Sequence, residues 1–363
     1  MNYPHKRIES IDALRAFALL GILVVHTSQL YNFNNEHNDF SYFTPYGFKL
    51  IDFIEHFLQN RFVILFSILF GTSFYLILKN PAYSKKKFCW RCILLIVFGL
   101  INKLFYTTDI LVWYGINGIL LSTIPVRKLS AKSIFILAII FYIFSFQRLF
   151  YIGDLVSPIY DDYSQRYLTS AGINGIISYP YIEVLKEDIR LFGSLGSITL
   201  SYFLFGFFLG KSNVIEKIDQ LSGIKTVIGF FVLYILVFLV YRYFDYHPNV
   251  KKIYNLIGAI FYAVIFIYTY NRYHNLLSFM SKYGKLGLTH YSVQNVFLTI
   301  IIAIILVQTT WSFEFILIIA LLFYCLQTLF SIQWLKYYKY GPLEYIWRIF
   351  TNLKYISNLR THD

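Results

Sequence analysis

The sequence has little charge for its length, since Asp, Glu, Lys and Arg make up only 14% of its 363 residues. An average soluble domain is about 25% charged, so this chain lacks the polar surface that would cover a water-exposed globule. The shortage excludes a soluble enzyme, a disordered chain and a secreted disulfide-rich scaffold. The sequence is instead 57% hydrophobic and 21% aromatic, which is typical of a polytopic membrane protein.

Cysteine is also scarce. Cys89, Cys92 and Cys325 all fall within apolar stretches or on their inner side, so we expect no disulfide on an extracytoplasmic surface. Cys89 and Cys92 form a CxxC pair, but neither a second CxxC pair nor a His pair follows it. We therefore expect no metal site.

Long apolar stretches, separated by polar breaks, account for most of the chain. A membrane-spanning helix needs about 20 mostly apolar residues. Ten stretches approach this length: Ile11–Leu30, Arg61–Leu78, Cys92–Phe105, Ile110–Pro125, Ser133–Tyr151, Phe192–Gly210, Thr226–Tyr243, Ile253–Tyr270, Leu286–Val307 and Phe313–Trp334. The pattern predicts an all-α fold of about ten transmembrane helices, forming a single transmembrane domain over residues 1–363.

The net charge of +13 is explained by topology. Membrane proteins keep an excess of Lys and Arg on their cytoplasmic side. With the N-terminus inside, 21 of the 32 basic residues lie in inner segments, and the outer segments carry most of the acids. We therefore expect both termini to be cytoplasmic, with extracytoplasmic loops at 31–60 and 152–191 and a cytoplasmic tail at 335–363. A nucleic-acid partner is not required.

The first predicted span carries three ionisable residues on one stripe. Each such residue costs roughly 2.5–3.5 kcal/mol at a membrane centre and is a functional candidate by default. Asp12 and Arg15 are three residues apart, which predicts an ion pair near the inner surface. His26 follows Arg15 by eleven residues, about three turns, and so lies on nearly the same face roughly 16 Å further along.

This spacing suits a chemistry with an anionic donor at the cytoplasmic end and a base near the exterior. Arg15 would contact the donor, and the neutral imidazole of His26 would take a proton from an attacking hydroxyl or amine. The alternative is that His26 only forms a hydrogen bond to a neighbouring helix. The spacing alone does not choose between the two.

Other polar groups in or near the spans are candidates for substrate contacts. Asp109 and Tyr114 mark the fourth predicted span, and His290 and Gln294 lie near one face of the ninth. They would line a substrate pocket, an ion path or a set of interhelical hydrogen bonds. The basic loop from Lys79 to Arg91 would bind phosphates of a cytoplasmic donor or simply fix the topology.

Several sequence blocks carry a family resemblance. Residues 7–26, RIESIDALRAFALLGILVVH, resemble the first helix of the transmembrane acyltransferase superfamily. Five further blocks resemble one branch of it, the bacterial YeiB-like family of unknown function (domain of unknown function 418): Arg61–Gly71, Asp109–Gly118, Phe203–Gly210, Gly284–Gln294 and Gly341–Arg348.

The resemblance implies about ten helices and, through the wider superfamily, transfer of an acyl group from cytoplasmic acyl-CoA to an exterior acceptor. Arg15 and His26 match the functional pair of the acyltransferase branch, with Asp12 beside them. That branch also has an Arg-x-x-Arg motif, where this chain has Lys87 and Arg91 at a different spacing. His290 stands where the YeiB-like branch usually has Asn.

We therefore expect an acyltransferase of the bacterial cytoplasmic (inner) membrane. Its donor would be acyl-CoA (acetyl-CoA), bound by Arg15, Arg91 and Lys87 through charge-assisted bonds. Its acceptor would be an extracytoplasmic saccharide or small molecule with a hydroxyl or amine, and its other partner is the lipid bilayer. The alternatives are a transporter of a small or lipid-linked molecule, and a non-catalytic membrane partner.

Overall fold

The computed structural model describes residues 8–37, 45–80, 83–106, 109–146, 196–221, 223–308, 311–353, 357 and 359. These residues form helices and no β-strand, and one isolated bridge joins Tyr338 to Leu359. The all-α prediction is therefore confirmed over this part of the chain. The elements are α1 (Glu9–His37), α2 (Pro45–Phe53), the π-helix η1 (Ile54–Leu58), α3 (Arg61–Leu78), α4 (Lys85–Asn102), α5 (Leu111–Thr123), α6 (Ala131–Phe144), α10 (Ser197–Lys211), the 3-10 helix η3 (Ile215–Lys217), α11 (Ile218–Leu221), α12 (Ile224–Tyr243), α13 (Pro248–Arg272), α14 (His274–Lys285), α15 (Gly287–Gln308), α16 (Phe313–Tyr337) and α17 (Pro342–Asn352).

Five helical segments of the described chain are long and apolar enough to cross a membrane: Glu9–Tyr31, Lys49–Leu78, Ile224–Tyr243, Pro248–Arg272 and Phe313–Tyr337. Helices α5, α6 and α10 are apolar but shorter. The chain is thus a multi-pass membrane protein. Each of the ten predicted spans overlaps a helix of the structure, while their number as membrane crossings stays a prediction.

The structure adds helix where the hydropathy pattern predicted loops. The segment 31–60 contains the end of α1, α2 and η1, and the predicted tail from 335 contains α17. Helix α14 was not predicted, and α4 begins at Lys85 rather than at Cys92. These segments carry more polar residues than a span, because each covers the bundle with one face only. The predicted loop at 152–191 lies outside the described residues.

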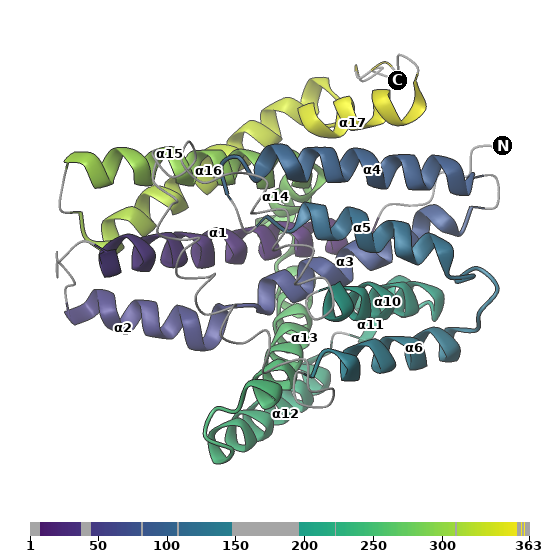
Figure 1. Ribbon diagram of the computed structural model, residues 1–363, viewed down its shortest axis with the longest axis horizontal. Helices are drawn as coiled ribbons and strands as arrows, with labels where there is room; N and C mark the ends of the chain where they lie inside the picture. Colours follow the sequence, from purple (N-terminus) through teal and green to yellow (C-terminus); the bar gives the residue numbers. More distant parts are fainter. Residues whose placement is uncertain are drawn as a thin grey trace.

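Helix α1 forms the centre of the bundle, and it contacts α3, α13, α14, α15 and α16. In Figure 1 it lies between α15 and α16 above and α2 below, with α4 and α5 paired beside it. Ala13, Ala16 and Ala18 are fully buried along it, because small side chains let neighbouring helices approach closely. The α12–α13 hairpin projects from the lower edge and leaves most of α12 exposed.

Loops that were predicted to lie inside are bonded to one another. Lys79 after α3 forms an ion pair with Glu216 after α10, with 3.3 Å between Nζ and Oε1. Arg127 after α5 donates to the carbonyl of Tyr83 before α4 at 2.8 Å, and Lys211 donates to the carbonyl of Arg127 at 3.1 Å. These segments therefore gather at one end of the bundle, as an alternating topology requires.

Candidate active site

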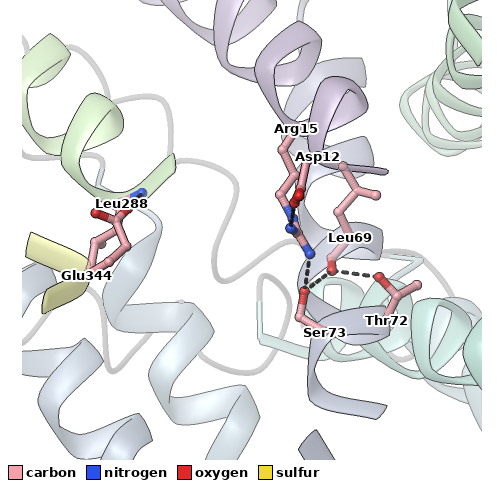
Figure 2. A network of polar contacts seen from close by, with 7 residues as sticks. All are labelled: Asp12, Arg15, Leu69, Thr72, Ser73, Leu288 and Glu344. Atoms are coloured by element: carbon pink, nitrogen blue, oxygen red, sulfur yellow. Dashed lines mark hydrogen bonds and ion pairs between the residues drawn. The ribbon is translucent and has the colours of Figure 1, made fainter. Parts of the chain in front are cut away.

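The predicted pair on α1 is formed and attached to α3. Asp12 Oδ1 lies 2.5 Å from Arg15 NH1, and Arg15 NH2 donates to Ser73 Oγ at 2.8 Å. Ser73 in turn donates to the carbonyl of Leu69 (Figure 2). Asp12 is buried and Arg15 half-buried, so the guanidinium keeps access to surrounding groups.

Close contact between α1 and α14 fixes the position of this pair. A Cβ on Gly284 would lie 1.8 Å from the carbonyl oxygen of Asp12. Only a residue without a side chain lets the two backbones meet at this distance. Gly284, the first residue of the Gly284–Gln294 block, is therefore required for close helix packing next to the Asp12–Arg15 ion pair.

His26 lies further along α1 and is buried beneath an aromatic ring. The centroids of His26 and Tyr106 are 4.3 Å apart and the rings are nearly parallel. Tyr106, which follows α4, donates from its hydroxyl to Gln29 Oε1 at 3.2 Å. The α4–α5 connection thus covers the imidazole.

A buried polar cluster surrounds this histidine. Asn102 Nδ2 donates to Asp109 Oδ2 and to Ser292 Oγ, both at 3.2 Å, and Lys103 is near enough to interact electrostatically with Asp109. We call the following residues the His26 cluster: His26, Gln29, Asn102, Lys103, Tyr106, Asp109, Tyr291, Ser292 and Asn295. They come from α1, α4, the α4–α5 connection and α15.

Asn295 is the member with unused hydrogen-bonding capacity. It lies next to the imidazole of His26 and the hydroxyl of Tyr291. Neither its amide nitrogen nor its amide oxygen reaches hydrogen-bond geometry with a described residue, although the side chain is buried. Buried polar groups in proteins are normally bonded, and a small rotation would let this amide bond to His26, to Tyr291 or to a ligand beside them.

The predicted substrate residues do not all lie together. Asp109 belongs to the His26 cluster, whereas the hydroxyl of Tyr114 turns to α3 and lies 2.7 Å from Ser67 Oγ. His290 Nε2 lies 2.6 Å from Ser331 Oγ of α16. Gln294 occupies the same face of α15 as His290, and this face points away from His26.

His290 and Gln294 belong to a closed network of their own. Gln294 Nε2 donates to Tyr283 Oη at 2.8 Å and to Gln327 Oε1 at 3.1 Å. The ring of Tyr283 stacks on His290 with centroids 4.1 Å apart. The network joins α14, α15 and α16, so these side chains form hydrogen bonds between helices.

The start of α15 is held by the last helix. Glu344 Oε1 accepts a hydrogen bond from the backbone nitrogen of Leu288 at 2.7 Å (Figure 2). It also accepts one from the backbone nitrogen of Thr289 at 3.1 Å. Thr289 Oγ1 also donates to Glu344 Oε2 at 2.6 Å. A carboxylate at a helix N-terminus satisfies free N–H groups and complements the helix dipole. Two of the resembling sequence blocks therefore meet here.

The predicted donor-binding cations have different surroundings. The guanidinium of Arg91 lies over the Trp347 ring of α17 at 4.0 Å, and Trp347 donates to the carbonyl of Arg91 at 3.0 Å. Arg91 Nε has no partner among the described residues. The ammonium of Lys87 lies 5.7 Å from the Tyr83 ring centroid. Arg91 thus faces α17, while Arg15 is bonded to α3.

Sequence reasoning missed Tyr106 and Ser292 because neither carries charge and tyrosine is common throughout this chain. Their positions follow from the packing of the α4–α5 connection on α15, which no local pattern encodes. Within the described residues, no three His, Cys, Asp or Glu side chains are grouped as metal ligands.

Relatives of the chain are themselves of unknown function. Residues 226–354, from α12 into the segment after α17, match a family model described as "Protein of unknown function (DUF418)". An uncharacterized 39.9 kDa protein in the amylase 3′ region of Bacillus acidopullulyticus is 24% identical, over 95% of this chain and 94% of the relative. Uncharacterized protein YxaH of Bacillus subtilis is 24% identical, over 97% and 96%.

Uncharacterized protein YeiB of Escherichia coli is 23% identical over 95% of this chain and 96% of its own length. No solved structure matches the chain. The similarity to these relatives extends over nearly their whole length, and the family model covers the helices that carry His290, Asn295 and the Glu344 cap. The chain is thus similar over residues 226–354 to the DUF418 family of unknown function, and over nearly its whole length to YeiB and the two Bacillus proteins.

Proposed function

We propose that the protein is a membrane-embedded acyltransferase that moves an acyl group, most simply acetyl, from cytoplasmic acyl-CoA to an extracytoplasmic acceptor. The acceptor is a hydroxyl or amine of a glycan or small molecule. The location is the bacterial cytoplasmic membrane, with both termini in the cytoplasm. The observation that carries the proposal is the buried imidazole of His26 with the amide of Asn295 beside it.

The layout of α1 supports a reaction between two sides of the membrane. Arg15 lies at the end where the basic loops gather, and His26 lies eleven residues further along the same face. At 1.5 Å per residue, the two side chains start about 16 Å apart along the helix axis. The pantetheine arm of a donor would have to extend over this distance to bring its thioester to His26.

In this reaction His26 is the general base. It accepts the proton of the acceptor hydroxyl or amine while that oxygen or nitrogen forms a bond to the acyl carbon. The carbon–sulfur bond of the thioester breaks, and the proton passes from His26 to the CoA thiolate. The amide of Asn295 would donate to the carbonyl oxygen as its charge increases, and Asp109 would orient the acceptor.

Cations at the other end would hold the phosphates of the donor. Arg91 supports this role because Trp347 holds the guanidinium in place. Lys87 lies one turn earlier on the same helix. Arg15 is already paired with Asp12, so we assign it the positioning of the donor rather than charge neutralisation alone.

A proteoliposome assay tests the proposal. In vesicles that hold the protein with its cytoplasmic face outward, radiolabelled acetyl-CoA is added outside and a panel of sugars and amines is enclosed inside. His26→Ala should lower acyl transfer at least 100-fold, the usual scale for loss of a general base. His274→Ala is the control, because His274 is exposed at the start of α14. Transfer by His26→Ala at the rate of His274→Ala would exclude the mechanism. Passage of the acceptor through wild-type protein without any acylated product would favour a transporter.

A further inference from the structure

A second polar site lies away from the His26 cluster. A small cavity of about 70 Å³ opens between η1 and the α12–α13 hairpin. Six residues line it: Glu55, His56, Gln59, Tyr241, Lys251 and Tyr254. The lining contains one carboxylate, one ammonium, one imidazole, one amide and two phenols. This is an unusual concentration of hydrogen-bonding groups in a chain with so little charge.

The backbone beneath the cavity has an irregular geometry that is held by a buried cation. Residues Ile54–Leu58 form a π-helix, a rare conformation that occurs often at functional sites. Arg61 is fully buried, and its guanidinium donates to the carbonyls of His56 at 2.9 Å and Gln59 at 3.3 Å. Arg61 therefore fixes the turn that presents two of the lining side chains.

A buried cation lies against one of the lining residues. The guanidinium of Arg61 lies over the Tyr254 ring at 4.4 Å and has no carboxylate within ion-pair distance in the described chain. A buried charge without a counter-ion is costly, which favours an anionic group close by. Lys251 contributes a cation to the wall itself, so the cavity attracts negative charge.

Helix η1 contributes groups that attract a cation. Glu55 contributes a carboxylate to the wall. The Nδ1 of His56 lies 2.9 Å from the carbonyl oxygen of Asp52, so Nδ1 carries the hydrogen in the neutral ring and Nε2 is left as an acceptor. The wall of one small space thus combines acceptors on η1 with the ammonium of Lys251 on the hairpin.

We propose that this cavity binds a small zwitterion, with its phosphate or carboxylate at Lys251 and Tyr241 and its ammonium at Glu55 and His56. The size of the cavity suits a group such as phosphoethanolamine and excludes a nucleotide. The same chemistry occurs in a free metabolite and in a phosphatidylethanolamine headgroup. The site is independent of acyl transfer, because none of its residues belongs to the His26 cluster.

Calorimetric titration of the full-length protein with O-phosphoethanolamine tests this assignment. The protein is held in nanodiscs of phosphatidylcholine alone. Wild type should bind, whereas inorganic phosphate and ethanolamine added separately should bind at least tenfold more weakly. Glu55→Gln and Lys251→Gln should each weaken binding at least tenfold. Lys252→Gln is the matched control, since the Nζ of Lys252 donates to the carbonyl of Ser145 and Lys252 does not line the cavity.

Three outcomes would overturn the proposal: no binding by wild type, unchanged binding by both Glu55→Gln and Lys251→Gln, or inorganic phosphate binding as tightly as phosphoethanolamine. Tyr241→Phe removes one hydroxyl and serves as a milder variant if a charge change impairs folding. Nanodiscs that contain phosphatidylethanolamine identify the source. Lower apparent affinity for the free compound there indicates that the lipid headgroup competes for the cavity, and unchanged affinity indicates a soluble ligand.

Discussion

At the residue scale, two neighbours on α15 have opposite surroundings. The amide nitrogen of Gln294 has two partners, Tyr283 and Gln327, while the amide of Asn295 has no hydrogen bond with a described residue. Consecutive helical residues are about 100° apart around the axis, so one side chain enters the α14–α16 network and the other faces His26. The first supports the bundle, and the second lies beside the proposed general base.

Replacement by leucine separates these roles. Asn295→Leu should leave the melting temperature unchanged or raise it, because an unbonded buried amide is exchanged for an apolar group. Gln294→Leu should destabilise the protein by about 1–3 kcal/mol, because it leaves buried partners without hydrogen bonds. Thermal unfolding in detergent, followed by tryptophan fluorescence, measures both. Equal destabilisation by the two variants would show that Asn295 is also structural.

Under the proposed function, Asn295→Leu should also lower acyl transfer at least tenfold in the proteoliposome assay. A stable variant with normal transfer would remove Asn295 from the reaction while leaving His26 to be judged by its own substitution.

Some of this site could be predicted from local spacing. The Asp12–Arg15 pair follows from two opposite charges three residues apart on a helix, and the structure contains it. The neighbours of His26 could not be predicted in the same way. Tyr106 and Asn295 are 80 and 269 residues distant from it in sequence, and they meet it only because the α4–α5 connection and α15 pack on α1.

At the element scale, helix ends are set by contacts with other helices. Glu344 of α17 caps α15, and Gly284 of α14 permits its contact with α1. The sequence pattern predicted α3 at Arg61–Leu78, the same bounds as in the structure. It missed α14 and α17 because both are amphipathic and too polar for a hydropathy pattern to distinguish from loops.

The cap predicts a specific pH dependence of stability. Glu344 lies after the last candidate span, and burial raises the pKa of its carboxyl above the ordinary value. The folded protein therefore keeps this proton at pH values where the unfolded chain has lost it. The stabilising contribution is full in acid and is lost as pH rises through the folded-state pKa.

The melting temperature of wild type minus that of Glu344→Gln should therefore decrease as the pH rises above about 4, the ordinary pKa of a glutamate carboxyl. Glutamine keeps an acceptor for the backbone nitrogens of Leu288 and Thr289 but has no proton to release. A difference that stays constant or increases with pH would contradict the raised pKa.

Gly284→Ala tests the contact between α1 and α14. The new Cβ would meet the carbonyl of Asp12 and force two helices apart, so we expect a loss of about 1–3 kcal/mol or more. Gly229→Ala on exposed α12 is the control, since a Cβ there has nothing within 4 Å. That change should be neutral or slightly stabilising because alanine favours helix. Thermal unfolding of both variants under identical conditions gives the comparison, and equal melting temperatures would show that α14 can shift freely.

At the scale of the whole molecule, the charge pattern and the contacts between loops both place the basic loops at the same end of the bundle. The basic loops after α3, α5 and α10 are bonded together at one end. Composition predicted membrane insertion because a mean hydropathy of +0.56 leaves few polar groups for solvent. Composition could not predict that α1 is central, since that position depends on how the apolar faces of the different helices pair with one another.

Cysteine labelling tests the predicted orientation. In a variant whose Cys89, Cys92 and Cys325 are replaced by serine, Asp245→Cys in the α12–α13 turn should react with an impermeant maleimide in intact spheroplasts. Lys85→Cys at the start of α4 should react only after permeabilisation. Both side chains are exposed, so access is decided by the membrane. The reverse pattern would invert the topology.

The contact between Glu344 and α15 also has a consequence for the order of biosynthesis. Ribosomes release the chain from its N-terminus, so α15 enters the membrane before residue 344 exists. Its first N–H groups at Leu288 and Thr289 must find other partners, water or lipid headgroups, until α16 has crossed and α17 arrives. The N-terminus of α15 is therefore completed only after α16 and α17 have been synthesised.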